Sequence, residues 1–571
     1  MKPLLHIKEL TVAFGEGDKS TTAVKGISFI VNRGEILALV GESGSGKSVT
    51  SLSILRLLPS PPAHYPGGQI LFCENGADDI DLLRLDQQQL RGIRGNKIAM
   101  IFQEPMSSLN PVIRCGEQVV EALRAHKPMS KNAARAKTVE WFERVQLPDP
   151  ESIYHRYPHE LSGGQKQRVM IAMAMSCEPA LLICDEPTTA LDVTVQKTIL
   201  QLIRDLQQQT GMGVIFITHD LGVVAEIADR TVVLYKGEIV EQNTVSNLFG
   251  QPAHPYTKGL LACRPVLHKR GQRLPVVSDF LDPTRKPVLK DIVSDTSVST
   301  TDNTAALLEV RDLTVKFPGR KSFLGGVSSY VTAVDNVSFD VYPGETLGLV
   351  GESGCGKTTL GRSLLQLVRP TAGKILYKGN DITHFSTDEF RKLRKELQIV
   401  FQDPYSSLNP RISIGSAISE VLRVHGLAGH EKQRRDQVIR LLEKVDLPAA
   451  HYNRYPHEFS GGQRQRIVIA RALALNPSFI VCDESVSALD VSVQAQVLNL
   501  LNDLKKEFGF TIIFISHDLS VVRYISDRIM VMNKGRIEES GPADEVYLSP
   551  KSPYTQRLIA SIPRGLATPV D

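Results

Sequence analysis

The chain has 571 residues, of which 42% are hydrophobic and 22% charged, and its formal net charge is +4 at pH 7. These proportions are typical of globular proteins and exclude a disordered or fibrous chain, while the length predicts about three to five compact units. The small net charge excludes a strong electrostatic field for nucleic acid or for a membrane surface. The seven cysteines are scattered and form no CxxC pair, which excludes a disulfide framework and a structural zinc site. Because no apolar run reaches about 18 residues, the sequence predicts no membrane-spanning helix.

The first predicted element is a strand at residues 5–14, where apolar and polar side chains alternate. The segment lacks the apolar stretch of a secretion signal, so we expect the chain to stay in the cytoplasm. A fully apolar strand at 36–40 then leads into GESGSGKS at 41–48, and a helical segment follows. A strand, a glycine-rich loop and a helix in this order are the context of a phosphate-binding P-loop.

The chemistry of phosphate binding explains the residue types in this loop. Glycines let backbone N–H groups approach the phosphates, Lys47 adds a positive charge, and the hydroxyl of Ser48 can bind Mg²⁺. The candidate nucleotide-binding residues of the loop are Gly41, Ser43, Gly44, Gly46, Lys47 and Ser48.

Two further motifs follow along the chain. SGGQ at 162–165 is typical of a helix start, and it contributes Ser162, Gly164 and Gln165 as candidate anion-binding residues. LLICDE at 181–186 predicts a buried strand that ends in two carboxylates. Asp185 suits a water-mediated hold on Mg²⁺, and Glu186 suits polarisation of an attacking water.

The second half of the chain repeats these motifs in the same order. RYPHELSGGQKQR at 156–168 returns as RYPHEFSGGQRQR at 454–466, an offset of 454 − 156 = 298 residues. A second P-loop, GESGCGKT, begins at residue 351. The matching candidate residues are Gly351, Ser353, Gly354, Gly356, Lys357, Thr358, Ser460, Gly462, Gln463, Asp483 and Glu484.

The repeat predicts two domains of the α/β class, each with a mainly parallel sheet and an inserted helical region near 104–178 or 403–476. We expect the first domain to span 1–275 and the second 307–571. Between them we expect a flexible linker at 276–306, because residues 291–306 are rich in Ser, Thr and Asp without apolar periodicity.

The set of motifs resembles the ATP-binding cassette (ABC) family over nearly the full length of both halves. The resemblance implies tandem P-loop ATPase cassettes that bind ATP and Mg²⁺, and it adds further candidate residues. Gln103 and Gln402 would contact the metal, together with Ser48, Asp185, Thr358 and Asp483, and the D-loops would contain Asp192 and Asp490. His219 and His517 would act in catalysis with Glu186 and Glu484. Phe14 and Phe317 stand where that family places an adenine-stacking aromatic, although a core phenylalanine at a strand end is the alternative.

In that family two cassettes close head to tail, so the resemblance implies two composite ATP sites within this chain. Each site would join one P-loop with the signature SGGQ of the other half. The second half departs from the family pattern at Phe459 and Ser485, but neither change removes a catalytic atom, so we expect both sites to hydrolyse ATP. Cys355 lies at a helix N-terminus, which favours a reactive thiolate, although a small residue tolerated in the loop is an equal alternative.

The tails PAHPYTKGLL at 252–261 and KSPYTQRLI at 551–559 are similar to those of oligopeptide, dipeptide and nickel importer ATPases. Many of these carry a cysteine cluster after the tail, but only Cys263 is present here, so we expect no iron–sulfur centre. The resemblance implies two integral-membrane permeases and a periplasmic binding protein as partners, no nucleic acid, and a peripheral position on the cytoplasmic face of the bacterial inner membrane.

Segments such as 212–230 and 454–467 are similar to glutathione importer ATPases, which makes glutathione or a short peptide the expected cargo. A fused ATPase of an oligopeptide or microcin C importer is the alternative, on the similarity of 47–62 and 91–106. A double-cassette translation factor that acts on the ribosome is the alternative from another class. Such factors carry a long charged linker, whereas 276–306 is short and neutral to acidic.

Overall fold

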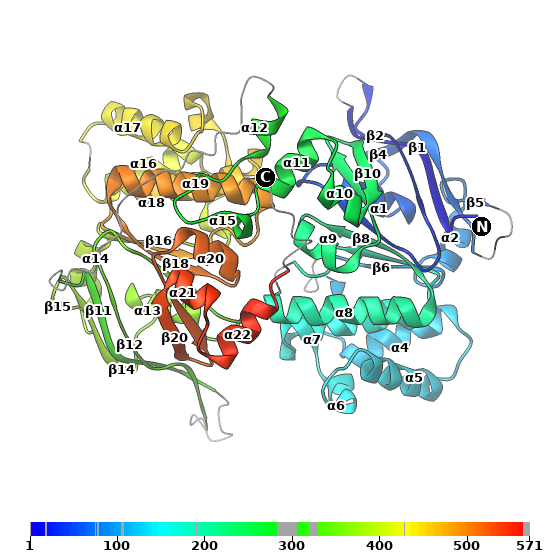
Figure 1. Cartoon of the computed structure of the whole chain (residues 1–571), viewed down its shortest axis with the longest axis horizontal. Coiled ribbons are helices and arrows are strands. Elements are labelled where there is room, and N and C mark those ends of the chain that lie inside the picture. Colours follow the sequence, from blue (N-terminus) through cyan, green and yellow to red (C-terminus); the bar gives the residue numbers. More distant parts are fainter. Residues whose placement is uncertain are drawn as a thin grey trace.

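The chain folds into two similar halves, each built on two β-sheets (Figure 1). The computed structural model describes residues 2–17, 20–74, 76, 79–103, 108–189, 191–282, 305–319, 329–427 and 429–563. Within the expected linker 276–306, residues 277–281 form helix α12 (Val277–Leu281), and 283–304 lie outside the described residues.

The central sheet of the first half has six strands in the order β10-β9-β3-β8-β7-β6. Its strands pair in parallel except for the β9–β10 pair, which is antiparallel. All five residues of β3 and of β7 are buried, as expected for a sheet covered on both faces. The strands are β3 (Ile36–Val40), β6 (Ile98–Ile101), β7 (Leu181–Asp185), β8 (Gly213–Thr218), β9 (Arg230–Tyr235) and β10 (Glu238–Thr244).

The N-terminal part of this half forms a second, antiparallel sheet of four strands in the order β2-β1-β4-β5. The alternation at residues 5–14 predicted its first strand, but no sequence pattern indicated that this sheet forms a separate layer. The strands are β1 (Leu5–Phe14), β2 (Thr21–Val31), β4 (Ala63–Phe72) and β5 (Ile80–Asp81).

Helices α4 to α7 form the inserted helical region that the sequence predicts, and its core holds the buried Trp141 and Phe142. The other helices surround the central sheet. The helices of this half are α1 (Lys47–Ile54), α2 (Gln87–Ile93), α4 (Cys115–His126), α5 (Lys131–Arg144), α6 (Pro150–His155), α7 (Gly163–Met175), α8 (Val193–Thr210), α9 (Leu221–Ile227), α10 (Val245–Gly250) and α11 (Pro255–Ala262).

The second half repeats this architecture, with sheets in the orders β12-β11-β14-β15 and β16-β17-β18-β13-β19-β20. The two copies confirm the predicted α/β fold. The strands are β11 (Leu308–Pro318), β12 (Tyr330–Val341), β13 (Thr346–Val350), β14 (Ala372–Tyr377), β15 (Asn380–Asp381), β16 (Leu397–Val400), β17 (Phe479–Asp483), β18 (Thr511–Ser516), β19 (Arg528–Asn533) and β20 (Arg536–Pro542). The helices are α13 (Lys357–Leu364), α14 (Thr387–Leu393), α15 (Pro404–Ser407), α16 (Ile414–Val424), α17 (Glu431–Lys444), α18 (Gly461–Leu473), α19 (Val491–Phe508), α20 (Leu519–Ile525), α21 (Ala543–Leu548) and α22 (Pro553–Ala560).

The two halves lie head to tail, so that the tail of each meets the long helix of the other (Figure 1). Helix α22 lies beside α8, where Lys197 Nζ donates to the carbonyl of Ala560 at 2.8 Å. On the other side, α11 and the following segment lie beside α19, and Asn499 binds both backbone groups of Leu274. This arrangement brings the P-loop of each half next to the D-loop of the other.

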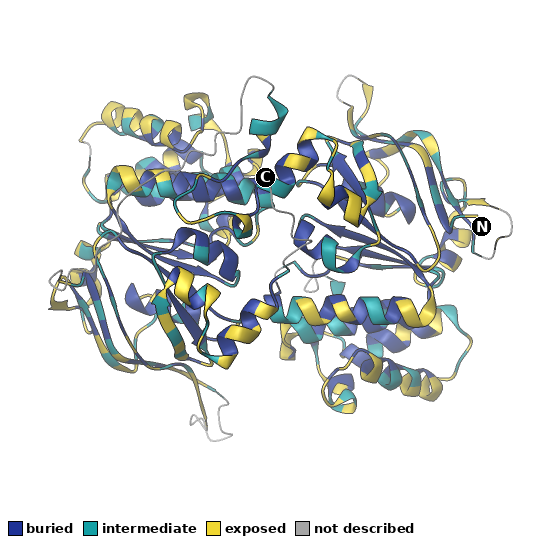
Figure 2. Cartoon of the chain, in the orientation of Figure 1, coloured by how far each residue is buried: buried dark blue, intermediate teal, exposed yellow. Residues whose placement is uncertain are grey.

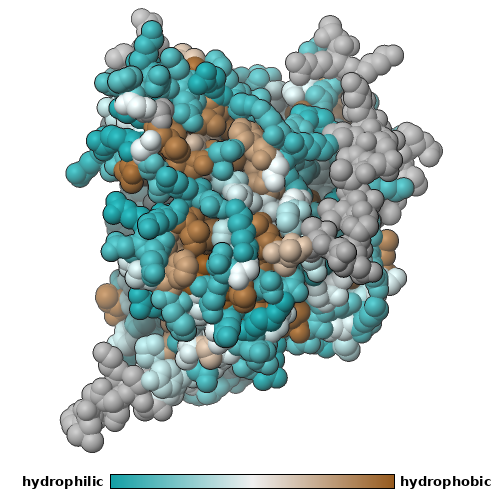
Figure 3. Space-filling model, turned by 90° about the vertical axis from the view of Figure 1, so that its left-hand side faces the viewer, coloured by the Kyte–Doolittle hydropathy of each residue, from teal (hydrophilic) through white to brown (hydrophobic). Residues whose placement is uncertain are grey.

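Burial follows the layers of the fold. The central strands are buried in both halves, and the outer helices expose one side, as α5 and α17 show (Figure 2). The end of the molecule formed by the second half is mostly hydrophilic, with smaller apolar patches between the polar side chains (Figure 3). Among the described residues, no helix combines the length and apolar character that a membrane span requires.

Candidate functional site

The first P-loop connects the buried strand β3 to helix α1. Gly41 has φ 153°, and a Cβ at this position would collide with the carbonyl oxygen of Leu234 on β9. The residue must therefore be glycine for the loop to pass so close to the neighbouring strand. Lys47 Nζ donates to the carbonyls of Gly41 at 2.7 Å and Glu42 at 2.8 Å, inside the curve of the loop. Burial lowers the pKa of Lys47, and the nearby carboxylates of Asp490 and Glu186 oppose this effect.

The second P-loop has the same geometry between β13 and α13. Lys357 Nζ donates to the carbonyls of Gly351 at 2.7 Å and Glu352 at 3.0 Å. Gly351 has φ 159°, where a Cβ would collide with the carbonyl of Met532. Both loops thus place a lysine ammonium and a helix N-terminus at one point, which is an arrangement suited to phosphate groups.

The hydroxyl at the start of each P-loop helix contacts the first carboxylate of the acidic pair. Ser48 Oγ donates to Asp185 Oδ1 at 3.2 Å, and Thr358 Oγ1 donates to Asp483 Oδ1 at 2.9 Å. The other oxygen of Asp483 is buried and has no hydrogen-bond partner among the described residues. Burial raises the pKa of Asp185 to about 6 and also raises that of Asp483. Arg362 Nε lies 4.0 Å from the unpartnered oxygen of Asp483, too far for a hydrogen bond. A carboxylate oxygen without a hydrogen-bond partner, beside a hydroxyl, fits Mg²⁺, which prefers oxygen ligands together with phosphates.

The second carboxylate, Glu186, is held by three side chains. Gln103 Nε2 donates to its Oε2 at 2.9 Å, Thr189 Oγ1 donates to the same oxygen at 3.0 Å, and His219 Nδ1 lies 3.3 Å from Oε1. Burial by itself would raise the pKa of Glu186, but His219 and Lys47 outweigh it and hold the pKa at about 2. Glu186 is therefore ionised at neutral pH. Its backbone has φ 47°, a strained conformation that proteins retain mostly at functional sites.

The corresponding Glu484 has φ 48° and is held less tightly. Gln402 Nε2 donates to its Oε2 at 2.8 Å, and His517 Nδ1 lies 3.6 Å from the same oxygen. Ser487, which replaces Thr189, donates instead to the backbone carbonyl of Glu484 at 2.9 Å. Burial opposes ionisation, but His517 and Lys357 lower the pKa of Glu484. The structure thus brings each predicted glutamine, glutamate and histidine together in both halves.

The SGGQ motifs begin helices α7 and α18 with a reciprocal cap. Ser162 Oγ accepts from the N–H of Gln165 at 3.3 Å, and Gln165 Oε1 accepts from the N–H of Ser162 at 3.1 Å. Ser460 and Gln463 make the same pair of hydrogen bonds at the same distances. Gly164 and Gly462 pack against a valine of the following long helix, Val195 or Val493. Exposed serines at two helix N-termini are groups that can bind an anion.

Contacts between the halves join each P-loop to the D-loop of the other. The N–H of Ser43 donates to Asp490 Oδ2 at 2.8 Å, and the side chain of Glu42 accepts a hydrogen bond from Ser492. In the other direction, Thr194 Oγ1 donates to Glu352 Oε1 at 2.8 Å. None of the sequence motifs predicted a role for Glu42, Glu352, Thr194 or Ser492. Their signal was the retention of a hydroxyl two residues after each D-loop aspartate, in DVT and DVS.

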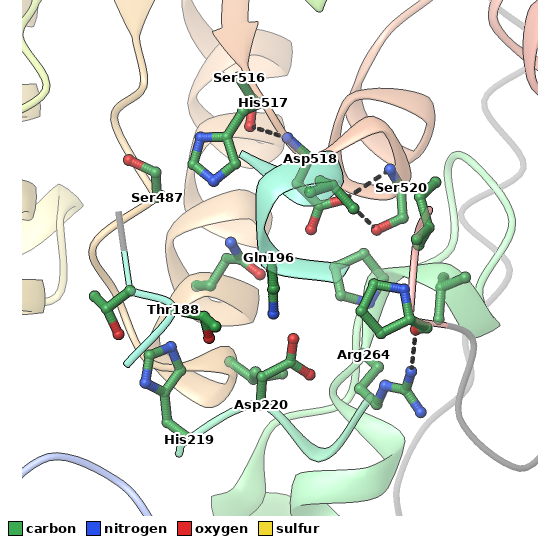
Figure 4. A pocket seen from close by; sticks show the side chains of 18 of the residues that line it. Thr188, Gln196, His219, Asp220, Arg264, Ser487, Ser516, His517, Asp518 and Ser520 are labelled. Atoms are coloured by element: carbon green, nitrogen blue, oxygen red, sulfur yellow. Dashed lines mark hydrogen bonds between the residues drawn. The ribbon is translucent and has the colours of Figure 1, made fainter. Parts of the chain in front are cut away.

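A pocket lies where the segments around His219 and His517 face each other, between the D-loops and the tails (Figure 4). The first half contributes Thr188, His219 and Asp220, and the second contributes Ser487, His517 and Asp518. Asp220 and Asp518 accept backbone N–H groups at the starts of α9 and α20, which fixes both loops. His219 and His517 therefore line the same pocket from opposite halves.

Three other predictions concern single side chains. Phe14 is half-buried and packs on the core of its sheet, whereas Phe317 is 40% exposed at the end of β11. Contact of either ring with adenine stays a prediction. The expectation of a reactive thiolate at Cys355 is wrong, because this side chain is only 6% exposed and burial raises the pKa of its thiol. The favourable charge of Lys357 and the backbone hydrogen bonds do not overcome this desolvation.

Two protein family models each match segments in both halves of the chain. The family model described as ABC transporter matches residues 24–189 and 334–487, and the one described as oligopeptide/dipeptide transporter, C-terminal region, matches 240–281 and 539–567. The chain is 49% identical over 563 residues to the glutathione import ATP-binding protein of Pectobacterium atrosepticum, covering 98% of this chain and 90% of that protein. The protein of the same name from Escherichia coli K12 is 49% identical over 565 residues, with 98% and 89% coverage. A solved cassette dimer bound to ADP and phosphate is 27% identical and covers 41% of this chain and 98% of its own, with a TM-score of 0.38.

Proposed function

The chain belongs to the ABC transporter family, and from this premise we propose that it drives the import of glutathione or closely related short peptides with two ATP sites. One observation carries the proposal: both halves contain a complete set of P-loop, paired carboxylates, glutamine and histidine, and each P-loop contacts the D-loop of the other half. The tails matched by the oligopeptide/dipeptide transporter model, and the names of the relatives, support peptide import.

Each ATP site is composite in this proposal. Site 1 combines Lys47, Ser48, Asp185, Glu186 and His219 with Ser460, Gly462 and Gln463 of the second half. Site 2 combines Lys357, Thr358, Asp483, Glu484 and His517 with Ser162, Gly164 and Gln165. Contacts across the interface, such as that between Ser43 and Asp490, support this pairing of the halves.

The residues of each site divide the work of hydrolysis. The P-loop N–H groups and Lys47 or Lys357 bind the phosphates of ATP and stabilise the charge that develops during phosphoryl transfer. Glu186, ionised because its pKa is held at about 2, accepts a hydrogen bond from the attacking water, and Gln103 and His219 fix its carboxylate. Mg²⁺, when bound through Ser48 or Thr358 and the first carboxylate, would neutralise phosphate charge.

We also propose the partners and the location that this role requires. Two permeases would form the path through the membrane, and a periplasmic binding protein would deliver the peptide. The chain would lie on the cytoplasmic face of the inner membrane, held there by the permeases. Cargo selection would belong to these partners.

The test is transport by a reconstituted complex. The chain is co-purified with candidate permeases and placed in proteoliposomes with the ATPase facing outward, and the binding protein and radiolabelled glutathione are sealed inside. We expect export of label from the lumen to require external ATP, and a Lys47→Ala, Lys357→Ala double variant to abolish it. Movement of an oligopeptide but not of glutathione would contradict the cargo assignment, and co-sedimentation with ribosomes without any transport would contradict the importer.

A further inference from the structure

Each tail contains a tyrosine whose hydroxyl contacts the P-loop of its own half. Tyr256 Oη accepts a hydrogen bond from the backbone N–H of Glu42 at 3.0 Å, and Tyr554 Oη accepts one from Glu352 at 3.2 Å. The two side chains are 0% and 7% exposed. Because the same contact is present in both halves, it is a repeated feature of the fold.

The residues around Tyr256 explain how the tail directs this side chain. Glu241 at the edge strand β10 accepts the N–H groups of Ala253 at 2.9 Å and His254 at 3.0 Å. The ring of His254 then caps helix α11 by accepting the N–H of Tyr256 at 3.1 Å, and Pro255 occupies the first helical position. The sequence HPYT thus fixes the first turn of α11 with its tyrosine facing the P-loop.

The second tail reaches the same result with a different cap. Glu539 on β20 accepts the N–H groups of Lys551 at 2.8 Å and Ser552 at 3.0 Å. Ser552 takes the place of the histidine, and its hydroxyl accepts the N–H of Tyr554 at 3.2 Å. The cap residue changes between the tails, whereas the proline, the tyrosine and the anchoring glutamate are the same.

The backbone of Glu42 connects this tyrosine to the phosphate-binding lysine. Its N–H is bound by Tyr256, while its carbonyl accepts from Lys47 Nζ at 2.8 Å and its side chain accepts from Ser492 of the other half. Glu352 has the same three neighbours in Tyr554, Lys357 and Thr194. One P-loop residue therefore meets the tail, the lysine and the opposite D-loop at once.

We propose that Tyr256 and Tyr554 are positioning residues of the two ATP sites, which hold the first turn of each P-loop in the conformation that receives the phosphates. This inference rests on the proposed ATP sites and adds a role for the tail. Burial raises the pKa of both phenols, so each hydroxyl stays neutral and keeps accepting the P-loop N–H across the physiological range. A tail movement that withdraws the tyrosine would weaken ATP binding in its own half.

The experiment measures binding of the non-hydrolysable ATP analogue AMPPNP by calorimetry, with one site removed at a time. In the Lys357→Ala background only site 1 binds, and adding Tyr256→Phe removes one oxygen while keeping the ring. We expect the dissociation constant to rise about two- to tenfold, as for the loss of one hydrogen bond. In the Lys47→Ala background, Tyr554→Phe should weaken site 2 by a similar factor, and Tyr256→Phe should leave site 2 unchanged.

Tyr235 provides a matched control. Its ring packs on Tyr256 with centroids 4.3 Å apart, and in the described part of the chain its hydroxyl makes no hydrogen bond with the P-loop. Tyr235→Phe should therefore leave AMPPNP binding unchanged. Equal binding by Tyr256→Phe and Tyr235→Phe would overturn the inference, as would a Tyr256→Phe effect of equal size at both sites. Absence of AMPPNP binding by the unmutated chain would instead overturn the proposed ATP sites.

Discussion

Asp490 of the second half accepts two hydrogen bonds from Ser43 of the first P-loop, one from the backbone N–H at 2.8 Å and one from the hydroxyl at 3.2 Å. Its counterpart Asp192 has a different role, because it accepts the N–H of Val195 at 2.9 Å and so caps its own helix α8. Helix α19 has no such side-chain cap from Asp490. The two D-loop aspartates occupy equivalent positions in the sequence but make different contacts. Asp490 joins the two halves, whereas Asp192 caps its own helix.

This difference predicts distinct effects for Asp192→Ala and Asp490→Ala. Asp192→Ala removes a helix cap and should lower the free energy of unfolding by about 0.5–2 kcal/mol. Asp490→Ala removes charged hydrogen bonds between the halves and should lower ATP turnover about tenfold or more. Urea unfolding and steady-state phosphate release measure the two effects. Identical profiles for the two variants would show that the observed difference has no functional consequence.

The roles of Glu186 and Glu484 predict that both sites turn over. Glu186→Gln and Glu484→Gln keep the size of the side chain but remove the carboxylate that orients water, so each should slow hydrolysis at its own site about 10²- to 10⁴-fold. The measurement is single-turnover hydrolysis of radiolabelled ATP, counted per bound nucleotide. If one substitution left both nucleotides hydrolysed at the original rate, that glutamate would have no catalytic role.

We predict that the turnover of site 1 depends on the hydroxyl of Thr189 more strongly than site 2 depends on the matching hydroxyl. Thr189→Ala removes one of three side chains that hold the Glu186 carboxylate, and we expect turnover at site 1 to fall a few-fold, up to about tenfold, with the KM for ATP unchanged. Ser487→Ala is the matched change at site 2, where the hydroxyl donates to the backbone carbonyl of Glu484 instead of to its carboxylate. Its effect on turnover should be smaller. Equal losses would contradict a positioning role for Thr189.

From the contacts of Asn499 with the tail of the first half, we predict that this tail helps to hold the two halves together. Its amide donates to the carbonyl of Leu274 at 2.8 Å and accepts the N–H of the same residue at 3.0 Å, in a buried position. Asn499→Ala should cost about 1–3 kcal/mol and expose residues 264–282 to trypsin, because both backbone groups lose their partner. Gln201→Ala is the control, since Gln201 is the equivalent residue of α8 and is exposed. A digestion pattern shared by both variants would argue against the fastening role.

We predict that Lys505 makes the free energy of unfolding depend on pH. Burial and the positive charge of Arg270 together lower its pKa to about 8, although Glu345 opposes them. In the unfolded chain a lysine keeps its proton up to about pH 10.4. Between these values the unfolded state binds more protons than the folded state, so this lysine makes stability rise with pH. Lys505→Met should remove that rise in urea unfolding between pH 7.5 and 10, whereas Lys506→Met, at an exposed position on the same helix, should retain it.

Much of the candidate site could be predicted from the sequence because its chemistry is local. The P-loop places its glycines, lysine and hydroxyl within eight residues, at 41–48 and again at 351–358. The apolar strands that end at Asp185 and Asp483 predicted where these carboxylates lie, at one edge of a parallel sheet. The antiparallel sheet was missed as a separate layer because its bulged strands carry weaker alternation, with register shifts along β1 and β11.

The sequence by itself determined the family, the duplication and the candidate groups for ATP binding and hydrolysis, since each depends on residues close together in the chain. Only the tertiary structure decided which groups meet across long separations: Tyr256 with Glu42, 214 residues apart, and Ser43 with Asp490, 447 residues apart. It also decided that Cys355 is buried and that Asp192 and Asp490 act differently. Local patterns repeat in both halves, but burial and partners depend on how the two halves pack together.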